Sequence, residues 1–446
     1  MLIAPLAASC GQNEIPYAGP HREGSVPRPG VTGAGQAALM SSERDQFHPD
    51  SKFESIRKKR LTEFGYRESP ASGYPRTKAG VTRAFSDMAV EMGVLRYSSG
   101  EPAFPAFPFD YENDVARLRQ LYADHRLGEV VNESMPDLDA LCALMLHTYR
   151  FLEGGTIPRL EDDPGPSAEQ ITRFKRERNI GGTPRHYAAL FCQLALSCGY
   201  TGRLVGMHRV DETGMVREHQ VCEVFIPQYR KWVVFDPFSR ATYYAKNGIP
   251  QSALELRDIV FDRNYRSVRA FSLAGDLTAV PDIKEQLLPN YQYIYIWRMN
   301  DILSRSPRNG SVSWQELYQA HLVWEDERSP VADGRFEQLS CFTDTSNPRF
   351  PLNGVRYVTH NKADFYWMLN YVVLDFKPGT ESELECIFNA MIPNFQAFSA
   401  NGSSSVVSPA RAYRLKLYDC PGGLFAVRGV NAFGRQGFDS YLDFIW

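Results

Sequence analysis

Thiols are the side chains with the widest chemistry in this sequence, because a cysteine can bind metal, form a disulfide or act as a nucleophile. No two of them form a CxxC pair, and no histidine stands at zinc-ligand spacing, so we expect no metal site and no cofactor. Their spacing is too scattered for a disulfide framework, although a single disulfide between Cys386 and Cys420 is conceivable. Several lie in apolar runs and are interpreted as buried thiols. The eight cysteines are Cys10, Cys142, Cys192, Cys198, Cys222, Cys341, Cys386 and Cys420.

The stretch 181–238 predicts one buried helix followed by strands. Thr183 is a good N-cap, and Pro184 suits the first helical position, where its missing N–H does no harm. Apolar residues then recur at helical spacing until Gly199, which supplies the C-terminal stop. Three strand-like runs follow, namely GRLVGMH, HQVCEVFI and KWVVFDP, with a loop at 227–230 between the last two. We therefore predict a helix that Thr183 caps and that runs to about Ser197.

The same stretch resembles the core of the transglutaminase-like superfamily, which has a papain-like fold. The family pattern is roughly G-x-C-x-x-Y-A-x-L-F, a helix, G-[IY]-x-x-R-x-V-x-G, then H-x-x-x-E-V and W-x-x-x-D-P. Four segments match it in order: GGTPRHYAALF, GYTGRLVGMH, HQVCEVF and KWVVFDPF. The resemblance implies that the catalytic histidine is His219 and that the orienting carboxylate is Asp236. The position of the nucleophilic cysteine is occupied by Pro184.

The proline has a direct chemical consequence for such a site. Thiol catalysis needs a thiolate, a histidine that accepts and returns the proton, and a carboxylate that fixes the imidazole tautomer. Proline has neither a thiol nor an N–H, so Pro184 removes the nucleophile and an oxyanion donor together. Losing one such donor typically costs about 100- to 1000-fold in rate. The resemblance therefore predicts a transglutaminase-like fold without thiol chemistry at this position.

Other residues near the helix could in principle replace the lost nucleophile. Cys192 lies eight positions further along, which is about 12 Å from the catalytic end, and we interpret it as a core residue. Thr183 is adjacent to the nucleophile position, but its expected task is capping. His186 is expected to be an ordinary surface histidine. His219 and Asp236 are expected to survive on adjacent antiparallel strands, facing Pro184, either as a structural hydrogen-bonded pair or as part of a ligand cleft.

Composition is that of an ordinary globular protein, with 43% hydrophobic and 23% charged residues. The net charge of −3 gives no global basic field, so we expect no nucleic-acid partner. The N-terminal MLIAPLAASC resembles the end of a bacterial lipoprotein signal, truncated and without a basic region, in which Cys10 would carry the lipid. This favours an extracytoplasmic, cell-envelope location, with a cytoplasmic protein that has a disordered N-terminus as the alternative.

The chain is long enough for two or three domains. We expect a disordered tether at 1–50, an extended or helical segment at 51–110 and a transglutaminase-like domain at 111–345. Helical patterns at 113–127, 137–155 and 167–179 precede the predicted site. Short β-type runs from 346 to 446 predict an independently folding β-sandwich, and LFAVRGVNAFGRQGFDSYLDFIW resembles the end of a fibronectin type III or immunoglobulin-like domain. The predicted class is α+β, a helix on an antiparallel sheet followed by an all-β module.

Two functions follow from these expectations. The first is a pseudoenzyme: a binding or scaffold protein for a peptide, protein or glycan, with the transglutaminase-like fold and a disabled site. The second is a cysteine-protease-like amidase or acyl-transferase of the same fold, whose nucleophile lies elsewhere. Fold resemblance alone does not decide between them.

Overall fold

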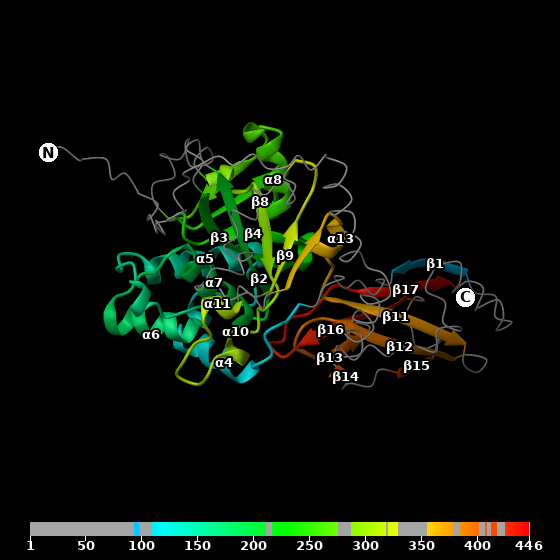
Figure 1. Ribbon diagram of the computed structural model, residues 1–446. Helices are drawn as coiled ribbons and strands as arrows, with labels where there is room; N and C mark the ends of the chain where they lie inside the picture. Colours follow the sequence, from blue (N-terminus) through cyan, green and yellow to red (C-terminus); the bar gives the residue numbers. More distant parts are fainter. Residues whose placement is uncertain are drawn as a thin grey trace.

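The computed structural model describes residues 93–98, 109–210, 216–274, 287–317, 320–328, 355–378, 383–400, 406–407, 412–416 and 424–445. The predicted tether, the lipid anchor at Cys10 and the proposed partner Cys420 lie outside the described residues. Within them the chain is a mixed α+β protein whose sheets are almost entirely antiparallel (Figure 1). No helix in the described part of the chain is both long and apolar enough to cross a membrane.

Helices dominate the first part of the described chain. Three amphipathic helices, at the three predicted places, precede α7, and shorter helices follow the central strands. The bounds are α4 (Val115–Asp124), α5 (Asp137–Leu152), α6 (Ala168–Arg178), α7 (Pro184–Ser197), α8 (Ala253–Phe261), α10 (Ile302–Arg305), α11 (Trp314–Leu317) and α13 (Lys362–Phe365).

A nine-stranded sheet forms the centre of the molecule. Its strands follow the order β10-β9-β8-β2-β3-β4-β5-β6, with β7 also paired to β5. Their bounds are β2 (Thr201–Val210), β3 (Val216–Ile226), β4 (Lys231–Asp236), β5 (Thr242–Lys246), β6 (Ile249–Pro250), β7 (Arg269–Ser272), β8 (Tyr293–Trp297), β9 (Ala320–Trp324) and β10 (Val355–Thr359). The strands β2, β3 and β4 are the three predicted from the sequence, and they pair antiparallel in that order.

The helix α7 is the central buried element, and its predicted bounds are confirmed. It begins at Pro184 directly after the N-cap Thr183 and ends at Ser197 before Gly199, which has a φ of +81°. Every residue from His186 to Ser197 is buried. The helix is packed against α4, α5 and α6 and against β2 and β3 of the sheet. Burial on all sides explains why the sequence of this helix is apolar around nearly its whole circumference.

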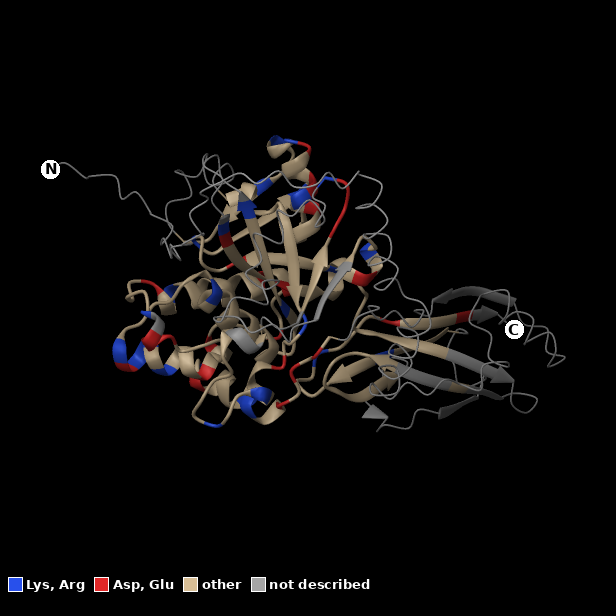
Figure 2. Cartoon of the chain, viewed as in Figure 1, with Lys and Arg blue, Asp and Glu red and all other residues tan. Residues whose placement is uncertain are grey.

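The sheet separates two hydrophobic cores, as the alternation of its side chains requires. Leu204, Cys222 and Val224 belong to the core shared with α7, whereas Val205 and Val221 belong to a second core shared with α8. Figure 2 shows that charges of both signs lie mainly on the helices and loops, and that the central strands are mostly uncharged. The α7 helix and the sheet therefore form a rigid support for residues at the ends of these elements.

The all-β part of the chain contains two further sheets. One has the order β11-β12-β15 and the other the order β1-β17-β16-β13-β14, and β11 is packed against β16 and β17. The bounds are β1 (Gly93–Ser98), β11 (Tyr371–Pro378), β12 (Glu383–Met391), β13 (Phe395–Ala400), β14 (Val406–Val407), β15 (Ala412–Lys416), β16 (Leu424–Asn431) and β17 (Ser440–Ile445).

The predicted domain boundaries need two corrections. The strand β1 lies in the segment 51–110, yet it pairs along β17 from Gly93 with Ile445 to Ser98 with Tyr441, so the C-terminal module borrows a strand from far upstream. In addition, β10 pairs parallel with β9 in the central sheet, so the module does not begin at 346. Strand pairing over such sequence separations leaves no local pattern to predict it. An isolated segment from about 350 would lack β1, and its β10 would lack its partner strand.

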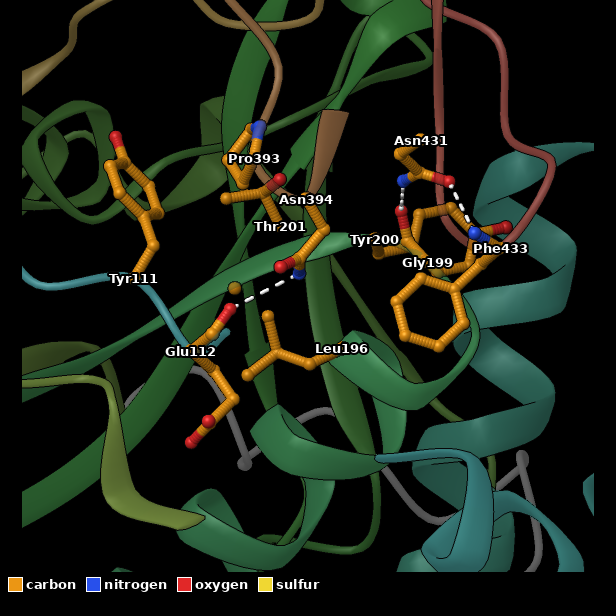
Figure 3. Close-up of a pocket in the computed structure, with 11 residues that line it drawn as sticks. Tyr111, Glu112, Leu196, Gly199, Tyr200, Thr201, Pro393, Asn394, Asn431 and Phe433 are labelled. Carbon is orange, nitrogen blue, oxygen red and sulfur yellow. Dashed lines mark hydrogen bonds between the residues drawn. The ribbon is translucent and has the colours of Figure 1, made fainter. Parts of the chain in front are cut away.

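The C-terminal module is docked on the end of α7. Arg435 stacks over the ring of Tyr200 at 3.5 Å and bonds to Asp137 and to the carbonyl oxygen of Cys198. The amide of Asn431 donates to the carbonyl oxygen of Gly199, and Figure 3 shows this bond at the wall of a cavity of about 10 Å³. A cavity of that size holds no more than one water molecule. The module thus contacts the C-terminal end of α7.

Candidate functional site

His219 and Asp236 form a buried hydrogen-bonded pair on adjacent antiparallel strands, as predicted. His219 lies on β3 and Asp236 at the end of β4, and the distance from His219 Nε2 to Asp236 Oδ2 is 2.7 Å. The second carboxylate oxygen accepts from the backbone N–H of Ser239 at 3.0 Å. Because Nε2 donates to the carboxylate, Nδ1 is the ring nitrogen left to accept a proton.

Aromatic contacts link this pair to the first turn of α7. The ring of Phe238 makes an edge contact with His219 at 6.2 Å between centroids and another with Tyr187 at 5.2 Å. Tyr187 is in the turn that begins with Pro184. The pair therefore lies near the start of the helix. That both side chains face the Pro184 ring stays a prediction.

Asp236 also acts on two buried tyrosines of the second core. Burial raises the pKa of Tyr244 and that of Tyr291 well above the ordinary value, and the negative charge of Asp236 raises both further. Asp236 is itself 1% exposed and is bonded by its two donors. These two hydrogen bonds therefore fix the position of Asp236 beside His219, and Tyr244 and Tyr291 are neutral phenols at neutral pH.

A second histidine network lies at the start of α7, and the sequence analysis missed it. His186 is completely buried, so its interpretation as a surface histidine is wrong. Its Nδ1 accepts the backbone N–H of Thr183 at 3.0 Å and lies 2.9 Å from Thr183 Oγ1. The backbone N–H of His186 donates to the backbone carbonyl oxygen of Thr183 at 2.9 Å. This is a capping box in which the third helical residue is a histidine, where Glu or Gln is usual.

Asp163 completes this second network from a loop before α6. Its Oδ1 accepts from His186 Nε2 at 3.0 Å, from Trp314 Nε1 at 2.8 Å and from the backbone N–H of Gly165 at 2.8 Å, and its Oδ2 pairs with Arg185. Burial opposes ionisation of Asp163, but His186, Arg185 and Trp314 outweigh it and hold the pKa of Asp163 below its usual range. Burial lowers the pKa of His186, and Asp163 only partly offsets this effect. His186 is therefore a neutral imidazole at neutral pH, and Arg185 provides the counter-charge.

Three of the described cysteines are poor nucleophiles. Cys192 is buried, as predicted, in the interior of α7. Burial raises the pKa of Cys142 and of Cys198 to about 12, and it raises that of Cys222 well above the ordinary value. Since the thiolate is the reactive form, these three thiols are almost entirely unreactive at neutral pH.

The arginine and glutamate of the matched motifs have a structural task. Arg203 and Glu223 are both fully buried and form a two-donor ion pair, with distances of 2.6 and 3.0 Å to one carboxylate oxygen. The guanidinium also lies 4.0 Å from the ring centre of Trp232 and donates to the carbonyl oxygen of Phe365. The other oxygen of Glu223 accepts from the backbone N–H of Ala253 at the start of α8. This pair holds β2, β3, the start of α8 and the end of α13 together.

A shallow groove of about 260 Å³ lies between α4 and α6. It is lined by charges of both signs, among them Asp124, Glu169, Arg173 and Arg176. Arg176 is already bonded to the carbonyl oxygen of Asp124, and Glu169 is paired with Arg117. The groove therefore offers no uniform field for a charged ligand.

Two comparisons of the sequence with known proteins found no match. No protein-family model matches the chain. No curated protein sequence matches it either.

Proposed function

We propose that the chain is a transglutaminase-like protein with a papain-like core and a C-terminal β-sandwich of fibronectin type III or immunoglobulin-like type. Support comes from the order of the elements, in which one buried helix is followed by three antiparallel strands. The His219–Asp236 pair and the Arg203–Glu223 pair both join residues of the matched motifs. The packing of β11 on β16 and β17 supports the sandwich.

The function that the His219–Asp236 site supports best is ligand binding without thiol catalysis. We infer an extracytoplasmic binding or scaffold protein for a peptide or glycan ligand, without thiol-dependent hydrolase or transglutaminase activity. The observation that carries this is Pro184 at the first position of α7, where the family nucleophile belongs. A proline there provides no thiol and no N–H, and burial raises the pKa values of Cys198 and Cys222.

The experiment restores the missing group. In Pro184→Cys the thiol would stand at the helix N-terminus beside His219, and Thr183 would still cap the helix. We expect iodoacetamide at mildly acidic pH to label this cysteine faster than any native cysteine, since burial keeps thiols such as Cys142 and Cys198 protonated. The double variant Pro184→Cys with His219→Ala should lose at least 10-fold of that rate, because the imidazolium no longer stabilises the thiolate.

Peptide mapping of the labelled proteins decides between the two functions. Rapid, His219-dependent labelling of a native cysteine in the wild type would contradict the non-catalytic proposal and favour an amidase or acyl-transferase. A folded Pro184→Cys protein that labels no faster than the native thiols would show that Pro184 does not occupy the nucleophile position.

Ligand binding is tested separately by thermal unfolding. A ligand that binds only the folded state stabilises it by RT ln(1 + [L]/Kd), or about 2.7 kcal/mol at 100 times Kd. We expect a rise in Tm with soluble peptidoglycan-type glycopeptides or with mixed short peptides. We expect the variant Phe238→Ala, which alters the surface between His219 and α7, to respond less. Equal Tm values with and without both ligand classes would contradict the binding function.

A further inference from the structure

Three side chains at the start of α7 are aligned as a hydroxyl, an imidazole and a carboxylate. Thr183 Oγ1 lies 2.9 Å from His186 Nδ1, and His186 Nε2 lies 3.0 Å from Asp163 Oδ1. These are the distances and the order of groups that activate a hydroxyl nucleophile: nucleophile, base and orienting acid. Neither His219 nor Asp236 belongs to this group of three residues.

The hydrogen bonds fix the tautomer of His186. A backbone N–H can only donate, so the N–H of Thr183 at 3.0 Å requires Nδ1 to be the unprotonated nitrogen. The proton of the neutral ring is then on Nε2, from which it is donated to Asp163. The Thr183 hydroxyl can therefore donate its own proton to Nδ1. This is the arrangement in which a base removes a proton from a nucleophile.

The surroundings favour negative charge on the Thr183 oxygen. It stands at the N-cap of a helix of 14 residues, where the helix dipole favours negative charge. Thr183 keeps 8% of its surface exposed, and its neighbours Gly182 and Pro184 are only half-buried. The helix start therefore reaches the surface, although the imidazole behind it does not.

A cap alone does not require this arrangement. A capping box needs one acceptor at the third helical position, and a Glu or Gln satisfies it. Here that position holds a fully buried histidine whose far nitrogen is bonded to a carboxylate, which is itself held by Trp314 and Arg185. A buried, oriented imidazole of this kind is costly to build for capping, and it is what general-base chemistry needs.

We propose that Thr183 is an acyl-accepting nucleophile, with His186 as its base and Asp163 as the residue that orients the base, and that its substrates are small esters or thioesters. The hydroxyl oxygen attacks the acyl carbon while its proton passes to His186 Nδ1. The tetrahedral intermediate then collapses, the bond to the leaving alkoxide or thiolate breaks, and the same proton passes to that group. Water attacks the Thr183 ester in a second round and releases the carboxylic acid, so no redox partner is needed.

The proposal goes beyond the binding function and does not depend on it, because no thiol takes part. The test uses p-nitrophenyl acetate on the full chain, with release of nitrophenol followed by absorbance and the acetylated peptide located by mass spectrometry. We expect one acetyl group on Thr183 in the wild type. Thr183→Ser should keep the adduct, since serine retains both the cap and the hydroxyl.

The matched control is Thr183→Asn. Asparagine is as good an N-cap as serine but has no hydroxyl, so the helix start should persist while the adduct at this position is lost. Asp163→Asn should slow acetylation of Thr183 by at least about 100-fold, the usual worth of an oriented base, and should alter the pH profile of the rate. A purely structural Asp163 would leave the pH profile unchanged in a folded variant.

Two results would overturn the proposal. One is a folded wild-type protein and a folded Thr183→Ser protein that both remain unacetylated at position 183. The other is acetylation of Thr183 that proceeds at the same rate in Asp163→Asn. Neither result changes the expected outcome of the iodoacetamide experiment on Pro184→Cys. The failure of the Thr183 proposal is therefore distinguishable from the failure of the proposed function.

Discussion

The two histidine networks of this protein differ in how their members are brought together. His219 and Asp236 are 17 residues apart and meet because β3 and β4 pair in one sheet. Thr183 and His186 are three residues apart on one helix turn, and Asp163 is added from a separate loop. The pair on the sheet consists of an imidazole and a carboxylate, whereas the network at the start of α7 also includes the hydroxyl of Thr183. The start of α7 therefore carries a hydroxyl, an imidazole and a carboxylate that are separate from the pair on the sheet.

The largest expected difference between the two networks is the loss of stability when the carboxylate of each is removed. Asp163→Ala leaves four donors without their acceptor, including the charged Arg185, and should lower the free energy of unfolding of the core by about 3 kcal/mol. Asp236→Ala leaves two donors and should cost about 2 kcal/mol. Urea denaturation followed by tryptophan fluorescence measures both. A larger cost for Asp236→Ala would reverse the comparison.

A third buried histidine, His125, has a second histidine and a threonine hydroxyl as hydrogen-bond partners, and its pKa is strongly lowered. His125 bonds to His147 at 3.2 Å and to Thr172 at 2.7 Å, and burial, followed by His147 and the positive charge of Arg176, lowers the pKa of His125 from 6.5 to about 3. The unfolded chain then binds a proton below pH 6.5 that the folded chain accepts only near pH 3. Stability from this group is complete above pH 6.5 and is lost as the pH falls towards 3.

This loss can be measured as a difference between two proteins. By pH 5 it should amount to about 2 kcal/mol in the free energy of unfolding, since one pKa unit is worth 1.36 kcal/mol. His125→Gln removes the titrating group, so its stability should fall less between pH 7 and pH 5 than that of the wild type. Parallel pH dependences in the two proteins would contradict the assignment.

Glycine 182 tests how tightly the helix network is packed. Gly182 has a φ of +96°, and an added Cβ would lie 2.7 Å from the Cβ of His186. Gly182→Ala should therefore cost about 1–2 kcal/mol and should disturb His186. Gly154→Ala is the matched control, because Gly154 has a φ of +70° with nothing within 4 Å of the added carbon. Similar Tm shifts in the two variants would mean that only the backbone conformation matters.

The smallest expected effect concerns the cap itself. Thr183→Ala removes the N-cap hydroxyl and its contact with His186 Nδ1 and should cost about 1 kcal/mol of stability. Thr183→Asn retains an acceptor and should stay within a few tenths of a kcal/mol of the wild type. Thermal unfolding of the two variants separates capping from the hydroxyl chemistry. A cost for Thr183→Asn as large as that for Thr183→Ala would mean that the hydroxyl–imidazole contact itself stabilises the fold.

The local sequence was sufficient to predict the helix and the strands that carry the candidate site. The Thr-Pro start, the apolar periodicity and Gly199 define α7 because caps, propensity and burial act within one or two turns. The alternating runs define β2, β3 and β4 for the same reason, and the motif spacing was sufficient to place His219 beside Asp236.

Tertiary structure alone decided the environment of these residues and the limits of the modules. Burial of His186 depends on Asp163 and Trp314, which come from separate parts of the chain, so no pattern around residue 186 distinguishes a surface histidine from a buried base. The pairing of β1 with β17 and of β9 with β10 likewise crosses long stretches of sequence. Such contacts form because they bury apolar surface and satisfy backbone hydrogen bonds once the chain is compact. The resulting free energy depends on residues far apart in the sequence, so no local segment predicts it.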